Sequence, residues 1–154
     1  MDDFRDNWLE QAEQLAREAH QGQKDKAGND YIGHSLRVSA RCESTEAKIA
    51  ALLHDTIEDT HVTPQLLREM GFADEIVDAV MALTRRNDET YAEFIVRASR
   101  NEIAKEVKIA DLEDNMDIRR LPEITETDSI RLRKYLHSWR YLKGLEESTV
   151  LIEG

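Results

Sequence analysis

The sequence has few of the residues that interrupt regular structure. It contains 6 glycines and 2 prolines among 154 residues, so we expect few turns and long uninterrupted segments. The single cysteine, Cys42, excludes an internal disulfide framework and favours a reducing compartment. No apolar run approaches the length of a membrane-spanning helix, and the acidic, interrupted N-terminus is unlike a signal peptide. We therefore expect a cytoplasmic protein with no membrane partner.

Positive charge is also in short supply. Lysine and arginine number 21 against 32 aspartates and glutamates, which gives a formal net charge of −11 at pH 7. Because non-specific binding to nucleic acid requires a basic face, the composition predicts no nucleic-acid partner. A small anionic substrate would need a metal ion or a local basic patch to offset the field. Hydrophobic residues make up 40% of the chain, enough for the core of one domain.

The apolar residues recur at three- and four-residue spacing over most of the chain, which predicts an all-α fold. We expect a single bundle of about eight helices, at about residues 4–21, 34–42, 45–58, 64–70, 73–83, 91–100, 102–120 and 128–145. Ser44 or Thr45 is the expected cap of the third helix, and Thr127 or Asp128 that of the last. The domain is expected to cover residues 1–146, with residues 147–154 as a poorly packed C-terminal tail.

The segment AALLHDTIEDT, residues 50–60, carries the clearest chemical pattern. At about 100° per residue, four ionisable side chains fall within an arc of about 140° on one face of a helix: His54, Asp55, Glu58 and Asp59. Such a face is simply solvated on many surface helices. Imidazole and carboxylate groups at this density are also ligands for a divalent metal, and Glu58 and Asp59, one turn on, are placed for acid–base chemistry.

A second pattern lies in EVKIADLEDNMD, residues 106–117. Asp111 lies in the middle of the apolar stripe, whereas its acidic neighbours Glu113, Asp114 and Asp117 are expected to face water. A buried carboxylate needs a cation, a hydrogen-bond network or a proton. An internal salt bridge or a cap would satisfy it. A metal shared with His54 and Asp55 accounts better for the polar residues of both segments.

One more imidazole would complete such a site, and His34 follows a loop bounded by Gly28 and Gly33. Alone, His34 would be read as a structural histidine. The other histidines fit less well. His20 ends the first helix, where a cation suits the dipole; His61 is expected to be exposed, and the pattern does not place His137.

The spacing of these residues resembles a known family. His34, the pair His54-Asp55, and Asp111 match the H…HD…D signature of HD-domain metal-dependent phosphohydrolases. The segments AHQGQKDKAGNDYIGH, AALLHDTIEDT and VKIADLEDNM further resemble the hydrolase domain of RelA/SpoT homologues, especially its small stand-alone forms, over about residues 8–145. The resemblance implies an all-α bundle that removes pyrophosphate from the 3′ position of guanosine tetra- or pentaphosphate, usually with manganese.

The resemblance also assigns residues to roles. The metal ligands would be His34, His54, Asp55 and Asp111, and the catalytic acidic pair would be Glu58 and Asp59. Substrate contacts would come from Lys24, Lys26, Asn115 and Tyr135. Three positions depart from the synthetase-linked enzymes, which commonly have arginine, proline and threonine where this chain has Asp25, Ser35 and Ile118. These departures leave the metal motif intact and concern recognition of guanine.

Other functions remain open at this level. One is hydrolysis of another phosphorylated nucleotide, such as a nucleoside phosphate or NADPH losing its 2′-phosphate. A second is a non-catalytic nucleotide sensor, which the intact pair Glu58 and Asp59 disfavours. A third is a helical scaffold whose polar clusters are structural. The expected partner is a small nucleotide, and the sequence leaves open whether the chain is a monomer or a homo-oligomer.

Overall fold

The computed structural model describes residues 2–25 and 27–151, with side chains from residue 7 onward. These residues form helices, turns and loops, and the only β-pairing among them is an isolated bridge between Lys24 and Asp30. The all-α prediction is therefore confirmed. In chain order the helices are α1 (Asp2–Ala19), α2 (Ile32–Arg41), α3 (Thr45–Leu53), α4 (Thr56–Asp59), α5 (Pro64–Glu69), α6 (Asp74–Ala82), α7 (Tyr91–Ser99), α8 (Glu102–Asn115) and α9 (Glu126–Leu142), with 3-10 turns η1 (Ile118–Arg120) and η2 (Ser148–Val150).

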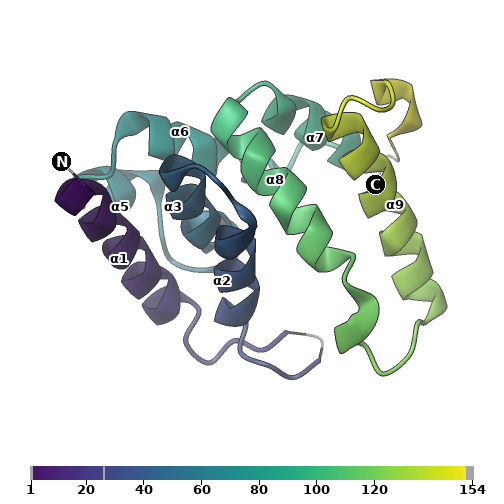
Figure 1. The fold of residues 1–154 in the computed structure, drawn as a ribbon, viewed down its shortest axis with the longest axis horizontal. Coiled ribbons are helices and arrows are strands. Elements are labelled where there is room, and N and C mark those ends of the chain that lie inside the picture. The colour runs from purple at the N-terminus through teal and green to yellow at the C-terminus, as the bar shows by residue number, and fades with distance from the viewer. Residues whose placement is uncertain (1, 26, 152–154) are drawn as a thin grey trace.

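Two hydrophobic cores flank the central helix α8. The larger core joins α1, α2, α3, α5 and α6 to one face of α8, and α3 packs against α1, α2, α6 and α8. The smaller core joins α7 and α9 to the other face, where Leu112 is fully buried. Figure 1 shows α8 between these two groups of helices, with α9 beside it. Residues of α8 that lie between the two cores are thus held by packing from both sides.

Side-chain caps set several helix boundaries. Ser44 Oγ accepts a hydrogen bond from the Ala47 amide at 3.2 Å, which selects Ser44 from the two predicted caps. The predicted cap of α9 at Thr127 or Asp128 is wrong. Thr125 is the N-cap, and its side chain and that of Asp128 each accept a hydrogen bond from the other residue's amide, at 3.1 and 3.0 Å. This capping box starts the helix at Glu126.

The helix predicted over residues 45–58 is interrupted at His54 and Asp55, which separate α3 from α4. The Leu53 carbonyl accepts a hydrogen bond from Thr56 Oγ1 at 2.7 Å, and the Ala51 carbonyl accepts one from His54 Nδ1. Side-chain groups that donate hydrogen bonds to backbone carbonyls compete with the backbone hydrogen bonds of a regular helix. The break falls within the HD dipeptide itself, so the single continuous helical face predicted for residues 50–60 does not exist.

The structure differs from the prediction in the C-terminal half as well. The helix predicted over residues 102–120 ends at Asn115, and residues 118–120 form η1, for which Asp117 is the cap. In the segment predicted as a poorly packed tail, residues 147–149 are exposed as expected, but Leu151 is not. Leu151 is buried in the smaller core beside α9, while residues 152–154 lie outside the described part of the chain. No described helix combines the length and the apolar character needed to span a membrane.

Candidate active site

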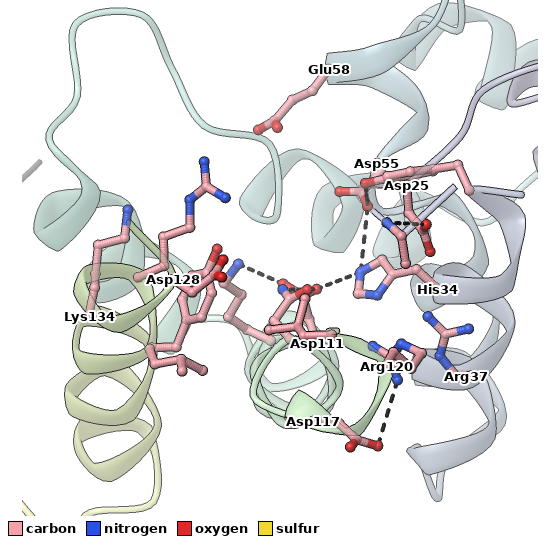
Figure 2. A pocket seen from close by; sticks show the side chains of 18 of the residues that line it. Asp25, His34, Arg37, Asp55, Glu58, Asp111, Asp117, Arg120, Asp128 and Lys134 are labelled. Atoms are coloured by element: carbon pink, nitrogen blue, oxygen red, sulfur yellow. Dashed lines mark hydrogen bonds and ion pairs between the residues drawn. The ribbon is translucent and has the colours of Figure 1, made fainter. Parts of the chain in front are cut away.

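A cavity of about 540 Å³ opens between the two cores. Its walls come from the loop between α1 and α2, from α2, α4 and α8, from the segment between α6 and α7, and from α9. In Figure 2, Asp111 of α8 lies between two ends of this cavity, with His34 and Asp55 on one side and Lys134 of α9 on the other. Three of the four residues predicted to bind metal, His34, Asp55 and Asp111, therefore line the cavity, and His54 is buried behind it.

Three of these residues form a tight buried cluster. His34, His54 and Asp111 each offer one ligand atom, and these atoms lie within 4.8 Å of one another. His34 Nε2 is 2.8 Å and His54 Nε2 is 3.6 Å from Asp111 Oδ1. They come from α2, the end of α3, and α8, so only the packing of three helices brings them together.

Asp55 joins this cluster from the turn that begins α4. Its Oδ2 atom is 3.1 Å from His54 Nε2 and 3.8 Å from His34 Nε2. The same oxygen accepts a hydrogen bond from the Tyr31 hydroxyl at 2.7 Å. The interruption of the helix after His54 is what lets two consecutive side chains face one point.

The tautomer of His54 is defined by its surroundings. Its Nδ1 atom contacts the Ala51 carbonyl, which only accepts, so Nδ1 carries a proton. Its Nε2 atom is buried and makes no hydrogen bond among the described residues, although it lies 3.1 Å from Asp55 Oδ2. A buried polar atom without a partner is costly, and an unprotonated Nε2 is the usual form of a histidine that binds a metal. This donor set of imidazole and carboxylate fits a divalent transition metal.

His34 is held in place by Asp114, for which the sequence analysis predicted the wrong environment. Asp114, expected to face water, is fully buried, and its Oδ2 atom is 2.7 Å from His34 Nδ1. The reason is helical geometry, because a residue three positions after Asp111 shares the face that α2 covers. Arg37 Nε, at 2.9 Å, and Arg120, at 3.3 Å, also donate to Asp114.

The local charges are strongly coupled. Burial alone would raise the pKa of Asp111, but Lys108, whose Nζ is 2.7 Å from Oδ2, and the two histidines hold that pKa well below its ordinary value. Burial alone would lower the pKa of His34, but its hydrogen bonds to Asp111 and Asp114 raise the pKa to about 9. The lowered pKa of Asp111 favours its ionised form, which can offer negative charge to a cation.

The predicted acidic pair is divided between two surfaces. Glu58 lines the cavity, and its Oε1 atom accepts a hydrogen bond from the Arg85 amide. Asp59 is absent from the lining and borders a neighbouring depression instead. Burial is the largest cause that raises the pKa of each group, and the negative charge of Asp55 adds to it. Figure 2 shows the Glu58 carboxylate apart from the cluster around Asp111.

The four predicted substrate contacts are spread around the cavity. Lys24, Asn115 and Tyr135 line it, while Lys26 lies outside the described residues. The exposed Lys24 pairs with Asp30 at 2.5 Å, and Asn115 donates to Asp111 Oδ1 at 3.1 Å. Asn115 therefore supports a carboxylate of the cluster as well as facing the cavity.

Sequence reasoning missed most of the positive charge in the cavity. Further lining residues are Arg37, Arg85, Lys108, Arg120, Arg131 and Lys134. Burial lowers the pKa of Lys134, and so do the nearby charges of Arg85, Arg131 and Lys108. The available signal was the spacing of Arg131 and Lys134, three residues apart on one helix. Because basic residues are common on any helix surface, that spacing alone indicates nothing about a ligand.

The remaining histidines lie outside the cluster. His20 is buried, with Nδ1 3.1 Å from Gln23 Oε1 and its ring centroid 5.0 Å from that of Tyr31. The prediction that His61 is exposed is confirmed. His137 is half-buried, with Nδ1 3.6 Å from Glu146 Oε2. His20 thus packs against Tyr31, whose hydroxyl donates to Asp55.

Comparison with known proteins gives matches over the same region. Residues 12–148 match the HD domain family. Two relatives named guanosine-3′,5′-bis(diphosphate) 3′-pyrophosphohydrolase are 37% identical over 116 residues, in Haemophilus influenzae, and 31% identical over 120 residues, in Aquifex aeolicus. A GTP pyrophosphokinase of Streptomyces coelicolor is 35% identical over 121 residues. These alignments cover 66%, 70% and 70% of this chain.

The matched region is a small part of each relative. It spans 17% of the Haemophilus influenzae and Aquifex aeolicus proteins and 14% of the Streptomyces coelicolor protein. A solved structure described as a metazoan orthologue of SpoT that hydrolyses ppGpp aligns with a TM-score of 0.73 at 23% identity. That alignment covers 92% of this chain and 88% of the other, so the two share a fold over nearly their whole length.

Proposed function

Because this chain belongs to the HD-domain family, we propose that it is a metal-dependent phosphohydrolase acting on a phosphorylated nucleotide. Our first choice of reaction is removal of pyrophosphate from the 3′ position of guanosine tetra- or pentaphosphate. The observation that carries this proposal is a single cavity that borders the buried cluster of His34, His54 and Asp111 and is lined by cationic side chains. The names of the Haemophilus influenzae and Aquifex aeolicus relatives support the choice of substrate.

The HD domain implies a divalent metal, and we propose manganese held by His34, His54, Asp55 and Asp111. The geometry that supports this set is the convergence of both Nε2 atoms on the carboxylates, with the Nδ1 atoms engaged elsewhere. When bound, such an ion polarises a phosphoryl oxygen and makes water a better nucleophile near neutral pH. Lys108 and Asn115 would keep the Asp111 carboxylate fixed during turnover.

Glu58 is proposed to orient the attacking water and to accept its proton. Its carboxylate lines the cavity, and its raised pKa brings the group closer to the working pH than an exposed glutamate. Asp59 is proposed to exchange protons with solvent from the neighbouring depression, since both acidic residues border that surface. In this scheme the two members of the pair act in sequence, and Glu58 alone contacts the reacting groups.

The distribution of cations supports a substrate that carries phosphates at two places. Lys24, Arg37 and Arg120 line the cavity with the metal-side residues, and Arg131 and Lys134 line it from α9. Tyr135 would then contact the base or the ribose between them, and Lys26 stays a proposed contact. A cavity of about 540 Å³ has the size of a small-molecule site.

A release assay tests the reaction directly. Purified protein with Mn²⁺ is incubated with guanosine tetraphosphate, ordinary 5′-nucleotides and NADPH, and both phosphate and pyrophosphate are measured. The proposal predicts pyrophosphate from guanosine tetraphosphate, with no release after EDTA treatment. Phosphate from NADPH alone would assign the site to the alternative substrate, and tight binding of a nucleotide without turnover would indicate a sensor.

A further inference from the structure

The two proposed imidazole ligands are fixed by different kinds of acceptor. His54 Nδ1 contacts a backbone carbonyl, that of Ala51, within its own helix α3. His34 Nδ1 contacts a carboxylate on a different helix, Asp114 Oδ2 of α8, at 2.7 Å. Both contacts leave Nε2 directed at Asp111, at 3.6 Å from His54 and 2.8 Å from His34. Only for His34 does a side chain, which can be substituted, fix the ring.

Asp114 is itself held in place by two arginines. Arg37 Nε donates to Oδ1 at 2.9 Å, and Arg120 donates to Oδ2 at 3.3 Å and to the Asp114 carbonyl at 3.0 Å. These contacts come from α2 and from η1, so the carboxylate is fixed from both sides. A fully buried carboxylate that already has two cationic partners does not need an imidazole to satisfy it. Its contact with His34 therefore calls for an explanation beyond charge balance.

From this geometry we propose that Asp114 is a positioning residue for the metal centre. Its carboxylate accepts a hydrogen bond from His34 Nδ1, which fixes the ring orientation and leaves Nε2 as the nitrogen that would bind the ion after losing its proton to solvent. Histidine ligands commonly donate their second nitrogen to a carboxylate, and loss of that partner weakens metal binding or activity about 10–100-fold. This inference rests on the proposed metal site but concerns a residue outside the ligand set.

A purely structural role for Asp114 is the competing explanation, since it also ties α2 to α8. Glu106 provides a matched control for that role. It lies on α8, and its carboxylate accepts hydrogen bonds from the Glu43 amide at 2.7 Å and from Ser44 Oγ at 2.9 Å. Glu106 thus ties the same helix to the segment after α2 without contacting an imidazole.

The experiment measures Mn²⁺ affinity by calorimetric titration of the metal-free protein, together with the melting temperature of the metal-free form. Asp114→Ala should weaken Mn²⁺ binding about 10–100-fold. Asp114→Asn should weaken it less, because the amide oxygen still accepts a hydrogen bond while its NH₂ group competes for the same position. Glu106→Gln should bind Mn²⁺ within about twofold of wild type, even if it lowers the melting temperature.

The outcomes separate this inference from the proposed function. If wild type binds no Mn²⁺, Co²⁺ or Zn²⁺, the metal site itself is wrong and the inference is overturned with it. If wild type binds Mn²⁺ and both Asp114 variants bind it equally well, the metal site stands and the positioning role is overturned. Should Asp114→Ala fail to fold, Asp114→Asn decides: an affinity within twofold of wild type rejects the role, and a larger loss supports it.

Discussion

The two ends of the cavity differ in which charged groups they carry and in whether those groups are paired. At the metal end, buried carboxylates and imidazoles contact one another, and Lys108 pairs with Asp111 at 2.7 Å. At the α9 end, neither Arg131 nor Lys134 forms an ion pair with any residue that the structure describes. Lys134 Nζ instead lies 4.4 Å from the ring centroid of Tyr91. One end can thus bind a cation, whereas Arg131 and Lys134 at the other end form no ion pair with a described residue, although Asp128 of α9 also lines the cavity.

This difference explains how an acidic chain could bind a polyphosphate. With a net charge of −11, the protein as a whole repels an anionic substrate. The unpaired cations of α9 give a local attraction at short range, and a bound divalent ion would reverse the charge of the other end. We therefore expect substitutions at the two ends, chelation of metal and added salt to affect hydrolysis and substrate binding differently.

The largest expected effect comes from the metal end. His54→Ala removes an imidazole whose Nε2 lies 3.1 Å from Asp55 and 3.6 Å from Asp111, so it should abolish hydrolysis and lower Mn²⁺ affinity. In wild type, saturating Mn²⁺ should raise the melting temperature, because a ligand bound only by the folded state stabilises it by about 4 kcal/mol at 1,000 times its Kd. Calorimetry with and without EDTA measures both effects. The exposed His61→Ala is the control, and an EDTA-insensitive wild type would contradict the metal assignment.

The metal end was also the part most open to prediction from the sequence. The HD dipeptide is contiguous, and Asp111 stands out as a carboxylate in an apolar stripe. The cluster of His34, His54 and Asp111 was predicted as part of one site, and the structure brings the three together. What periodicity could not predict was the break after His54, because hydrogen bonds from Thr56 and His54 to backbone carbonyls override the helical pattern.

The α9 end was not predictable, for a physical reason. Arg131 and Lys134 become significant only because α9 packs beside α8 and α7, which places their charges near Lys108. The same tertiary packing buries Asp114, which a one-helix projection placed toward water. The fold class follows from composition and spacing, whereas a site that joins distant segments depends on which helix faces are covered.

The second prediction separates the members of the acidic pair. Glu58→Gln keeps the size of the side chain but cannot accept a proton near neutral pH, so kcat should fall at least about a hundredfold. Asp59→Asn should have a smaller effect, because Asp59 does not line the cavity. Steady-state kinetics at saturating Mn²⁺, with metal content measured on the same samples, tests this order. If Glu58→Gln loses metal in proportion to activity, Glu58 is one of the ligands. If the two substitutions lower kcat equally, the different roles proposed for Glu58 and Asp59 are rejected.

The third prediction concerns the α9 end. Arg131→Ala and Lys134→Ala should raise KM for the nucleotide about 10–100-fold with a smaller change in kcat, as expected when a charged hydrogen bond worth about 1.5–3 kcal/mol is lost. The difference from wild type should shrink at high salt, because screening weakens the wild-type contacts as well. Arg133→Ala, on the same helix but outside the cavity lining, is the control. Unchanged KM at low salt would remove α9 from the substrate site.

The smallest expected effect concerns residues 84–89, the segment between α6 and α7 that forms part of the cavity wall. Arg97 Nε donates to Glu89 Oε2 at 2.7 Å. Its Nη2 atom donates to Glu89 Oε1 at 2.9 Å and to the Thr84 carbonyl at 2.7 Å. These contacts fix residues 84–89, which include Arg85 of the cavity wall. Hydrogen bonds from Arg97 are the largest cause that lowers the pKa of Glu89 to about 2.

A group whose pKa is lowered on folding stabilises the protein above its unfolded pKa and loses that effect as pH falls through its folded pKa. The free energy that Glu89 contributes should therefore be complete above about pH 4.5 and be lost on acidification toward pH 2. Glu89→Gln should lower the free energy of unfolding by about 1–3 kcal/mol at pH 7, and by progressively less below pH 4.5. Urea denaturation in the presence of EDTA, at pH 7 and at a pH below 4.5, measures this difference in the free energy of unfolding without a contribution from metal. A deficit that persists unchanged at low pH would show that packing, and not the ion pair with Arg97, is what Glu89 contributes.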